Sequence, residues 1–282
     1  MTTRDASLTG GWKPSQLMVR ILSAFVILFV VIGLILAGTY GAYALVLLLG
    51  GLALWEFIGL SDGMGARAPA WLLFPLGIFF AFSGTVLKGI DVELVLALAL
   101  VGGLAAFLVV PGRRQGLGRW AMGLSGALYI GMPFNFYLLL YTSRPDGLQW
   151  ALFTILAVVA CDAAALLVGS RIGRHPFFHN ISPHKTVEGA VAGLVGAMVV
   201  MLIGVSAVLG ISPWHALVLG LLVGVSAQVG DLAESQMKRI AEVKDSSNII
   251  PGHGGVLDRL DSILFPPILV FFYLTMFHIS GF

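Results

Sequence analysis

Long apolar runs alternate with short polar separators along the whole chain. A helix needs about 20 apolar residues to cross the hydrocarbon core of a bilayer, which is about 30 Å thick. The pattern therefore predicts an all-α polytopic membrane protein with about nine transmembrane helices. We expect them near residues 20–38, 41–60, 70–87, 92–111, 120–142, 149–170, 188–210, 214–237 and 262–280. The second and third runs are also compatible with one re-entrant unit.

Composition narrows the class of protein further. The chain is 58% hydrophobic and 11% charged, whereas a soluble domain carries about 25% charged residues. The net charge of +2 is too small to indicate a nucleic-acid partner. The single cysteine, Cys161, lies inside an apolar run, so we expect a buried core residue and no internal disulfide. Residues 1–20 are too polar for a secretory signal peptide, so the first run is expected to be a true span.

The basic residues are distributed unevenly between the two sides of such a bundle. If the N-terminus is cytoplasmic, all but two of the 16 Lys and Arg residues fall on the cytoplasmic side, the exceptions being Lys88 and Arg144. Cytoplasmic loops of membrane proteins carry this excess. We therefore expect a cytoplasmic N-terminus, a C-terminus on the opposite side, and cytoplasmic loops at 171–187 and 238–261. Residues 1–145 are expected to form an N-terminal transmembrane region, and residues 146–282 a C-terminal transmembrane region that carries both of these loops.

Ionisable residues inside the apolar runs are candidates for function, because a charge within the bilayer is costly. Glu56 and Asp162 are two of them. Glu56 lies near an interface, where a structural role is expected, either snorkelling to the surface or pairing with Arg67. Asp162 lies in the sixth run, and its role is left open.

The eighth run carries the most informative polar pattern. Asp231, Glu234, Ser235 and Lys238 are spaced so that they share one helix face. A helix from residue 214 to 243 is longer than the hydrocarbon core, so this face should emerge into the cytoplasm. An ion pair between Glu234 and Lys238 is the alternative interpretation. It leaves Asp231, one turn deeper, without a cation.

The segment IIPGHGGVLDRLDS, residues 249–262, gathers glycines around His253 and is followed by Asp258 and Asp261. Glycines allow a tight turn and close approach to a ligand. A helix cap by Asp261 or Ser262 is the alternative and explains only part of the pattern. Asp258 and Asp231 stand at the cytoplasmic ends of sequential helices, so we expect them to meet around a divalent cation such as Mg²⁺. The Lys and Arg residues of loop 238–261 suit a phosphoanhydride substrate.

Loop 171–187 is expected to contribute to the same site as loop 238–261. Its Lys and Arg residues can hold an anionic group, and its three His residues lack the spacing of a zinc site. Ser182 and Lys185 match a Ser-x-x-Lys nucleophile pattern whose other motifs are missing. A helix start at Ser182 or Thr186 is therefore expected instead.

Residues 235–261, SQMKRIAEVKDSSNIIPGHGGVLDRLD, resemble the signature of the phosphatidate cytidylyltransferase family, also called CDP-diacylglycerol synthases. Every fixed position of that signature is present: Ser235, Lys238, Arg239, Lys244, Asp245, Pro251, His253, Gly254, Gly255, Asp258, Arg259 and Asp261. Gly230-Asp231 and the upstream element from Ser182 to Gly189 also fit. The chain departs from the family at Val187, often Trp, and at Ala163 and Leu166, often a hydroxyl and an aromatic residue.

The resemblance implies an enzyme of phospholipid biosynthesis that converts CTP and phosphatidic acid into CDP-diacylglycerol and pyrophosphate. It implies Mg²⁺ held by Asp231 and Asp258, with a second, monovalent cation such as K⁺ as an option. The catalytic residues that it implies are Asp231, Asp258, Lys238 and His253. The substrate-binding residues that it implies are Ser182, Lys185, Ser235, Arg239, Lys244, Asp245, Gly254, Gly255, Arg259 and Asp261.

The implied location is the cell membrane, with the site facing the cytoplasm and membrane lipid as a partner. A homodimer is compatible with small-residue pairs at Gly189 and Gly193 and at Gly220 and Gly224. The alternative function is an ion-coupled transporter that uses Asp162 and Asp231. Transporters usually show repeated halves with broken helices, and no such repeat is evident in the sequence.

Overall fold

The computed structural model describes residues 16–109, 113–252 and 254–279, and these fold almost entirely into helices. The helices are α1 (Gln16–Leu36), α2 (Gly38–Gly63), α3 (Ala70–Phe82), α4 (Val92–Val109), α5 (Arg113–Thr142), α6 (Gly147–Ile172), α7 (Val187–Met201), a π-helical turn (Leu202–Ser206), α8 (Ala207–Leu209), α9 (Pro213–Ile240), α10 (Leu257–Leu264) and α11 (Pro266–Met276). No strand forms within the described ranges, where only two isolated β-bridges occur. The all-α prediction is confirmed.

Each predicted apolar run overlaps a helix. Among the residues described, six helices are long and apolar enough to cross a bilayer: Gly38–Gly63, Gly116–Thr142, Gly147–Ile172, Val187–Leu209, Pro213–Ile240 and Leu257–Met276. Helix α3 is only 13 residues long and ends before the predicted limit at 87. The hydroxyl of Ser83 donates to the carbonyl of Phe80, and the N–H of Gly84 donates to the side chain of Asn135, which ends the helix there.

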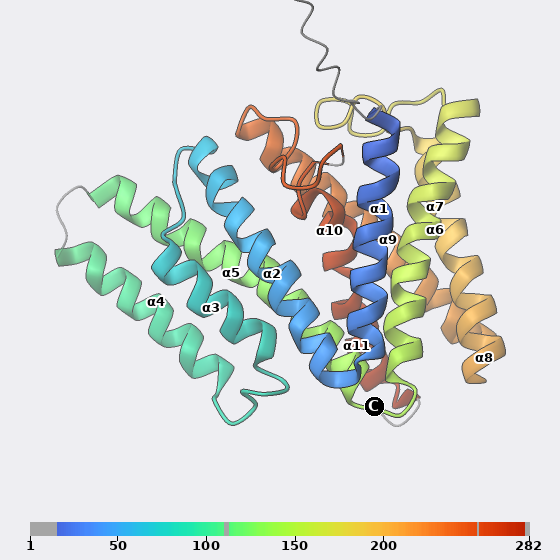
Figure 1. Ribbon diagram of the computed structural model, residues 1–282, viewed down its shortest axis with the longest axis horizontal. Coiled ribbons are helices and arrows are strands. Elements are labelled where there is room, and N and C mark those ends of the chain that lie inside the picture. Colours follow the sequence, from blue (N-terminus) through green and yellow to red (C-terminus); the bar gives the residue numbers. More distant parts are fainter. Residues whose placement is uncertain (1–15, 110–112, 253, 280–282) are drawn as a thin grey trace, which may run out of the picture.

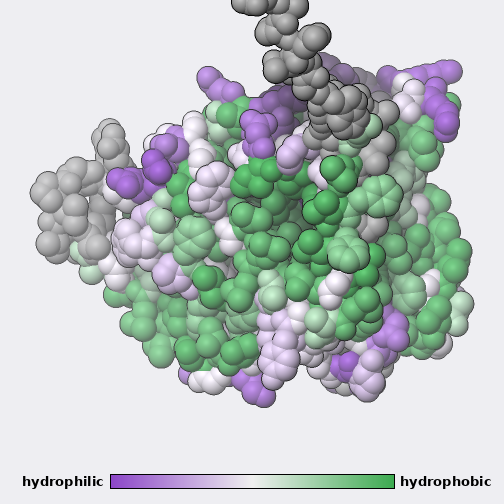
Figure 2. All heavy atoms as spheres, in the orientation of Figure 1, coloured by the Kyte–Doolittle hydropathy of each residue, from purple (hydrophilic) through white to green (hydrophobic). Residues whose placement is uncertain are grey.

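The helices run back and forth between two ends of the molecule (Figure 1). The Gln16 end of α1 lies at the same end as the loops 173–186 and 241–256, and α11 finishes at the opposite end (Figure 1). Helices α2 to α5 lie on one side, α6 to α8 on the other, and α9 to α11 between them. Figure 2 shows an apolar band around the middle of this face and polar residues toward the ends.

Two buried clusters form the core. The first packs α2, α3 and α5 against Ala241, which directly follows α9, and against residues of α10 such as Leu257. The second packs α6, α7, α9 and α11 around residues such as Cys161 and Val223. Cys161 is fully buried, as expected. The first cluster therefore joins the N-terminal helices to the segment that carries the signature.

Glycines let the helices approach one another closely. A Cβ on Gly193 would lie 2.9 Å from the carbonyl oxygen of Cys161, and one on Gly220 would lie 2.5 Å from the Cα of Met198. Gly189 and Gly224 are similarly enclosed. The small-residue pairs considered above as a dimer contact are therefore used for packing within the chain.

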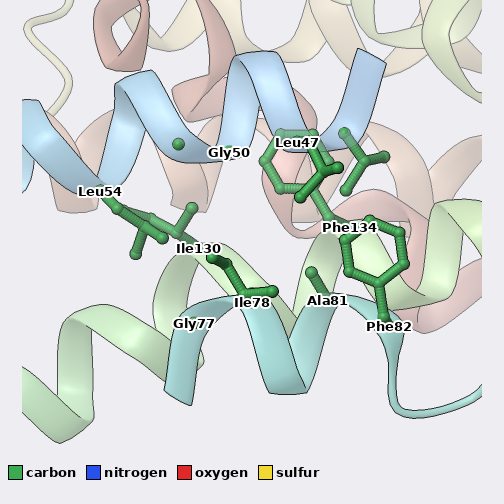
Figure 3. A pocket seen from close by; sticks show the side chains of 12 residues that line it. Leu47, Gly50, Leu54, Gly77, Ile78, Ala81, Phe82, Ile130 and Phe134 are labelled. Carbon is green, nitrogen blue, oxygen red and sulfur yellow. The ribbon is translucent and has the colours of Figure 1, made fainter. Parts of the chain in front are cut away.

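An apolar crevice between α2, α3 and α5 is shown in Figure 3. Leu47, Leu54, Ile78 and Phe134 line it together with Gly50 and Gly77. Its volume is about 10 Å³, roughly the space of one water. It is a packing defect between helices, and its lining offers no polar side chain to a ligand.

Two helix starts bear on the site. Thr186, and not Ser182, caps α7, because its hydroxyl accepts the N–H of Gly189. The alternative in which Asp261 or Ser262 caps the last span is excluded, since α10 already begins at Leu257. Helix α10 has no cap from its own segment, and its cap comes from α2, as described below.

Candidate active site

The polar face of α9 forms as its spacing predicts. The hydroxyl of Ser235 donates to Oδ1 of Asp231 at 3.3 Å. Lys238 forms an ion pair with Glu234, whose side chain is fully buried. The ion pair considered above as an alternative is thus present, and it is one part of a larger arrangement.

Asp231 receives its cation from the other polar loop. Nζ of Lys185 lies 2.7 Å from Oδ2 of Asp231, and both side chains are about one-quarter to one-third exposed. Lys185 therefore supplies the cation that the Glu234–Lys238 pair does not provide for Asp231. Lys185 precedes the cap of α7, and α7 packs along α9, so the loop delivers its ammonium to the deeper acid.

Lys238 links the face of α9 to α10. Its Nζ lies 2.7 Å from Oδ1 of Asp258, whose side chain is 6% exposed. The same ammonium pairs with Glu234, so it neutralises one carboxylate from each of two helices. Removing either acid or the cation from such a buried arrangement leaves a charge unpaired, which is costly.

The loop 241–256 wraps around the other oxygen of Asp258. Oδ2 accepts the N–H of Ser246 at 2.8 Å, the N–H of Gly255 at 2.8 Å and the hydroxyl of Ser246 at 2.9 Å. Gly254 has a φ of +83°, a conformation that favours glycine. The signature glycines thus let the backbone fold back onto the Asp258 carboxylate, where they orient it.

Glu56 of α2 reaches the same loop from the N-terminal half of the chain. It is 1% exposed, and its two carboxylate oxygens accept hydrogen bonds from Ser246, Ser247, Val256 and Leu257. Arg67 pairs instead with Asp62, at 3.7 Å. The expected pairing of Glu56 with Arg67, or its exposure at an interface, is therefore wrong.

Further acids lie around Asp231. The hydroxyl of Ser262 donates to Oδ2 of Asp162 at 3.0 Å, which connects α6 to α10. Asp261 lies within electrostatic range of both Asp231 and Asp162. Tyr129 of α5 brings a buried hydroxyl into range of Asp231 and Asp261. Helices α5, α6, α9 and α10 thus converge on one polar region.

Side chains of α9 and α7 bind the backbone of the loop 173–186. Nε of Arg239 donates to the carbonyl of Ile181 at 3.1 Å. Glu188 accepts the N–H groups of Arg174 and His175, and its Oε1 lies 2.6 Å from Nδ1 of His175. An open hollow of about 360 Å³ lies between this loop and Gln236 of α9.

The structure joins several of the predicted site residues and leaves others apart. Asp231 contacts Lys185 and Ser235, and Asp258 contacts Lys238. Gly254 and Gly255 shape the loop. Lys244 and Asp245 are exposed on that loop, and Ser182 lies in a turn of the other. Arg259 lies in the first turn of α10. His253 falls outside the described residues.

Residues that the sequence did not assign to the site are Glu56, Ser246, Ser247 and Tyr129. A charged residue inside an apolar run was the signal for Glu56. The two serines sit within the signature at positions that the resemblance does not fix.

The donor set suits Mg²⁺ that arrives with a nucleotide. Mg²⁺ binds through one or two protein carboxylates together with substrate phosphates, and Asp231 and Asp258 supply such oxygens. No three His, Cys, Asp or Glu side chains in the described ranges are arranged to hold a metal ion by themselves. Lys185 and Lys238, which pair with these carboxylates, are cations of the kind that also bind phosphate groups.

Fold and site together define a multi-pass helical membrane protein with a charged site of the kind that phosphoryl or nucleotidyl transfer requires. The model of the cytidylyltransferase family matches residues 18–277, so the chain belongs to that family and is a nucleotidyltransferase.

Similar proteins agree with this assignment. A Staphylococcus saprophyticus protein named phosphatidate cytidylyltransferase is 32% identical over 252 residues, covering 88% of this chain and 95% of that protein. Proteins of the same name from Staphylococcus aureus and Bacillus subtilis are 31% identical over 252 residues and 40% identical over 152 residues. The first covers 88% of this chain and 95% of the relative, and the second covers 54% and 56%. Nothing in these relatives supports the transporter alternative.

Proposed function

We propose that the protein transfers the cytidylyl group of CTP to phosphatidic acid, giving CDP-diacylglycerol and pyrophosphate. A phosphate oxygen of phosphatidic acid attacks the α-phosphorus of CTP. The bond from that phosphorus to the bridging oxygen breaks, and its electron pair leaves with pyrophosphate. Catalysis of such a transfer consists of positioning and charge neutralisation, with no need for a protein nucleophile.

The observation that carries this proposal is the double carboxylate–lysine arrangement across α9 and α10. Asp231 with Lys185 and Asp258 with Lys238 bring two acids and two ammonium groups to one end of the helices. The acids suit a metal ion and the lysines suit phosphates. A triphosphate with its Mg²⁺ is complementary to both.

In this proposal Asp231 and Asp258 hold Mg²⁺, which supplies charge neutralisation at the phosphates when bound. K⁺ is an option for a second cation near the further acids. Lys185 and Lys238 exchange their carboxylate partners for phosphate oxygens. The remaining proposed phosphate and substrate contacts are Ser182, Ser235, Arg239, Lys244, Asp245, Gly254, Gly255, Arg259 and Asp261, with His253 as a further catalytic group.

The proposal includes nine membrane-crossing segments in the cell membrane, with the N-terminus and the site on the cytoplasmic side. It is supported by the back-and-forth course of the helices and by the two basic loops at the Gln16 end of α1 (Figure 1). A cytosolic nucleotide then meets a lipid phosphate at the membrane surface. Residues 146–282 carry the chemistry, residues 1–145 support it, and a homodimer is compatible with this arrangement.

Purified protein in detergent–lipid micelles, supplied with phosphatidic acid and CTP labelled at the α-phosphate, tests the proposal. We expect labelled CDP-diacylglycerol that requires added Mg²⁺ and stops with a chelator. Asp231→Asn and Asp258→Asn should each lower turnover by roughly 100-fold or more, the range for loss of an electrostatic group at a reacting centre. Asp62→Asn removes an exposed carboxylate from α2 and is the matched control. Normal turnover in either site variant removes the metal assignment.

A further inference from the structure

Glu56 is a buried carboxylate whose hydrogen-bond partners all come from one distant segment. Its side chain is held in α2, whereas its partners lie about 190 to 201 positions later in the chain. We infer that Glu56 is a positioning residue for cytidylyl transfer, because its carboxylate holds Ser246, Ser247 and the start of α10 in the arrangement that aims Asp258 at the reactants. This inference rests on the proposed function.

The carboxylate is saturated by two donors on each oxygen. Oε1 accepts the hydroxyl of Ser247 at 2.6 Å and the N–H of Val256 at 2.8 Å. Oε2 accepts the N–H of Leu257 at 2.6 Å and the hydroxyl of Ser246 at 2.9 Å. Hydrogen bonds to an ionised acceptor are shorter and stronger than those between neutral groups. The contacts from Ser247, Val256 and Leu257 each use a proton of their own, so they hold the loop whichever carboxylate the Ser246 hydroxyl serves.

Two of these donors are at the start of α10. The first N–H groups of a helix have no partner within the helix, and α10 has no side-chain cap from its own segment. Glu56 supplies the missing acceptor from another helix, and its negative charge is favourable at a helix N-terminus. The position at which α10 begins, and hence the place of Asp258 in its first turn, depends on this contact.

Ser246 connects Glu56 directly to Asp258. Its hydroxyl lies 2.9 Å from Oε2 of Glu56 and 2.9 Å from Oδ2 of Asp258. A hydroxyl has one proton, so it donates to one carboxylate at a time, while the N–H of Ser246 holds Asp258 independently at 2.8 Å. The two carboxylates thus share one residue of the loop, so a shift of Ser246 away from Glu56 also alters its contacts with Asp258.

The fit leaves no room for change at Gly255. A Cβ there would lie 2.0 Å from the Ser246 hydroxyl and 2.7 Å from Oε2 of Glu56. The glycine that the family signature fixes at this position therefore has a physical reason. It admits the carboxylate of Glu56 to the backbone of the loop.

A glutamine at position 56 keeps the shape but cannot keep the contacts. Whichever way its amide is turned, the NH₂ group faces one backbone N–H, from Val256 or Leu257, and one serine hydroxyl. The hydroxyl can rotate and accept, but a backbone N–H cannot. Glu56→Gln therefore leaves one buried N–H of α10 opposed by another donor, and the start of α10 must move.

The experiment compares the wild type with Glu56→Gln and the control Asp62→Asn, all at full length in micelles. We expect Glu56→Gln to lower kcat at least roughly tenfold, the effect of one lost charge-assisted hydrogen bond. The KM for phosphatidic acid should stay within about twofold, because Glu56 is buried and its carboxylate is occupied by the loop. Hydrogen–deuterium exchange should accelerate in peptides covering 244–258 and stay unchanged in α6 and α7. Asp62→Asn should match the wild type in every measurement.

An unchanged kcat, or unchanged exchange in peptides 244–258, overturns the inference. So does exchange that accelerates equally in all helices, since Glu56 would then serve general stability and not the loop. If Glu56→Gln does not accumulate in the membrane, Ser247→Ala removes one donor and should shift kcat and local exchange in the same direction by a few-fold. A Ser247→Ala protein identical to the wild type in both also overturns it.

Failure of the proposed function gives a different result. In that case neither the folded wild-type protein nor the folded Glu56→Gln variant forms CDP-diacylglycerol with Mg²⁺ present. The exchange measurement still decides whether Glu56 holds the loop.

Discussion

Lys238 offers a sharp test of the network, because one ammonium serves two buried acids. In Lys238→Met the side chain keeps most of its length and loses its charge. Glu234 then loses the cation that it contacts inside a fully buried site, and Asp258 loses its contact at 2.7 Å. Asp258 retains the N–H groups of Ser246 and Gly255, so the cost falls mainly on Glu234.

The magnitude follows from that burial. Removing one partner of a buried ion pair destabilises a protein by about 3–5 kcal/mol. In a chain of this size each kcal/mol lowers the melting temperature by about 2–4 °C. We therefore expect the apparent melting temperature of Lys238→Met to fall by roughly 6–20 °C. Lys88→Met removes an exposed lysine from a loop and should have almost no effect.

A second substitution separates charge from packing. Glu234→Gln in the Lys238→Met background removes the acid that has lost its cation, so about half of the lost melting temperature should return. The assay is thermal unfolding of the detergent-solubilised protein, monitored by a dye or by retained solubility. If the double variant is no more stable than Lys238→Met, or if Lys238→Met melts like the wild type, the described pairing is wrong.

Two further predictions concern packing and nucleotide binding. Gly230→Ala places a Cβ 2.3 Å from the carbonyl oxygen of Asp261, so α9 and α10 must separate. We expect the free energy of unfolding to fall by about 1–3 kcal/mol and turnover to fall with it. Gly59→Ala, which has open space at its Cβ, is the control, and equal behaviour of the two variants contradicts the close approach. Lys244→Ala should raise the KM for CTP several-fold and change kcat less, with Lys88→Ala as control. An unchanged KM in steady-state kinetics moves Lys244 out of the nucleotide site.

The approximate positions of the helices could be predicted because each long apolar run forms a helix, although α3 has 13 residues and α5 has 30. The prediction failed where a helix end depends on a distant partner. Helix α3 ends at Phe82 because Asn135, 51 positions away, binds the N–H of Gly84. Helix α10 begins earlier than expected because Glu56 caps it from α2. The local pattern of apolar and polar residues marks Glu56 as unusual, but it does not indicate the distant partner in either contact.

In the candidate site, too, contacts within one helix could be predicted and contacts between distant segments could not. The shared face of Asp231, Glu234 and Lys238 could be predicted because helical spacing alone determines it. The partners across segments could not, and Asp231 turned out to pair with Lys185 from the other loop. Glu56 was recognised as a charge in an apolar run but was assigned to Arg67, which is near in sequence. Burial and tertiary contacts decide such pairings, and a single sequence does not reveal them.

The isolation of Cys161 has a practical consequence. Its sulfur is enclosed by α6, α7 and α9, 3.9 Å from the carbonyl oxygen of Gly224, so water-soluble maleimides should not reach it in the folded state. A cysteine introduced at the exposed Lys88 or Asn248 would then be the sole reactive thiol, without any need to delete the native one. Whichever of the two is labelled by an impermeant reagent added to intact cells reports directly which end of the bundle faces outward.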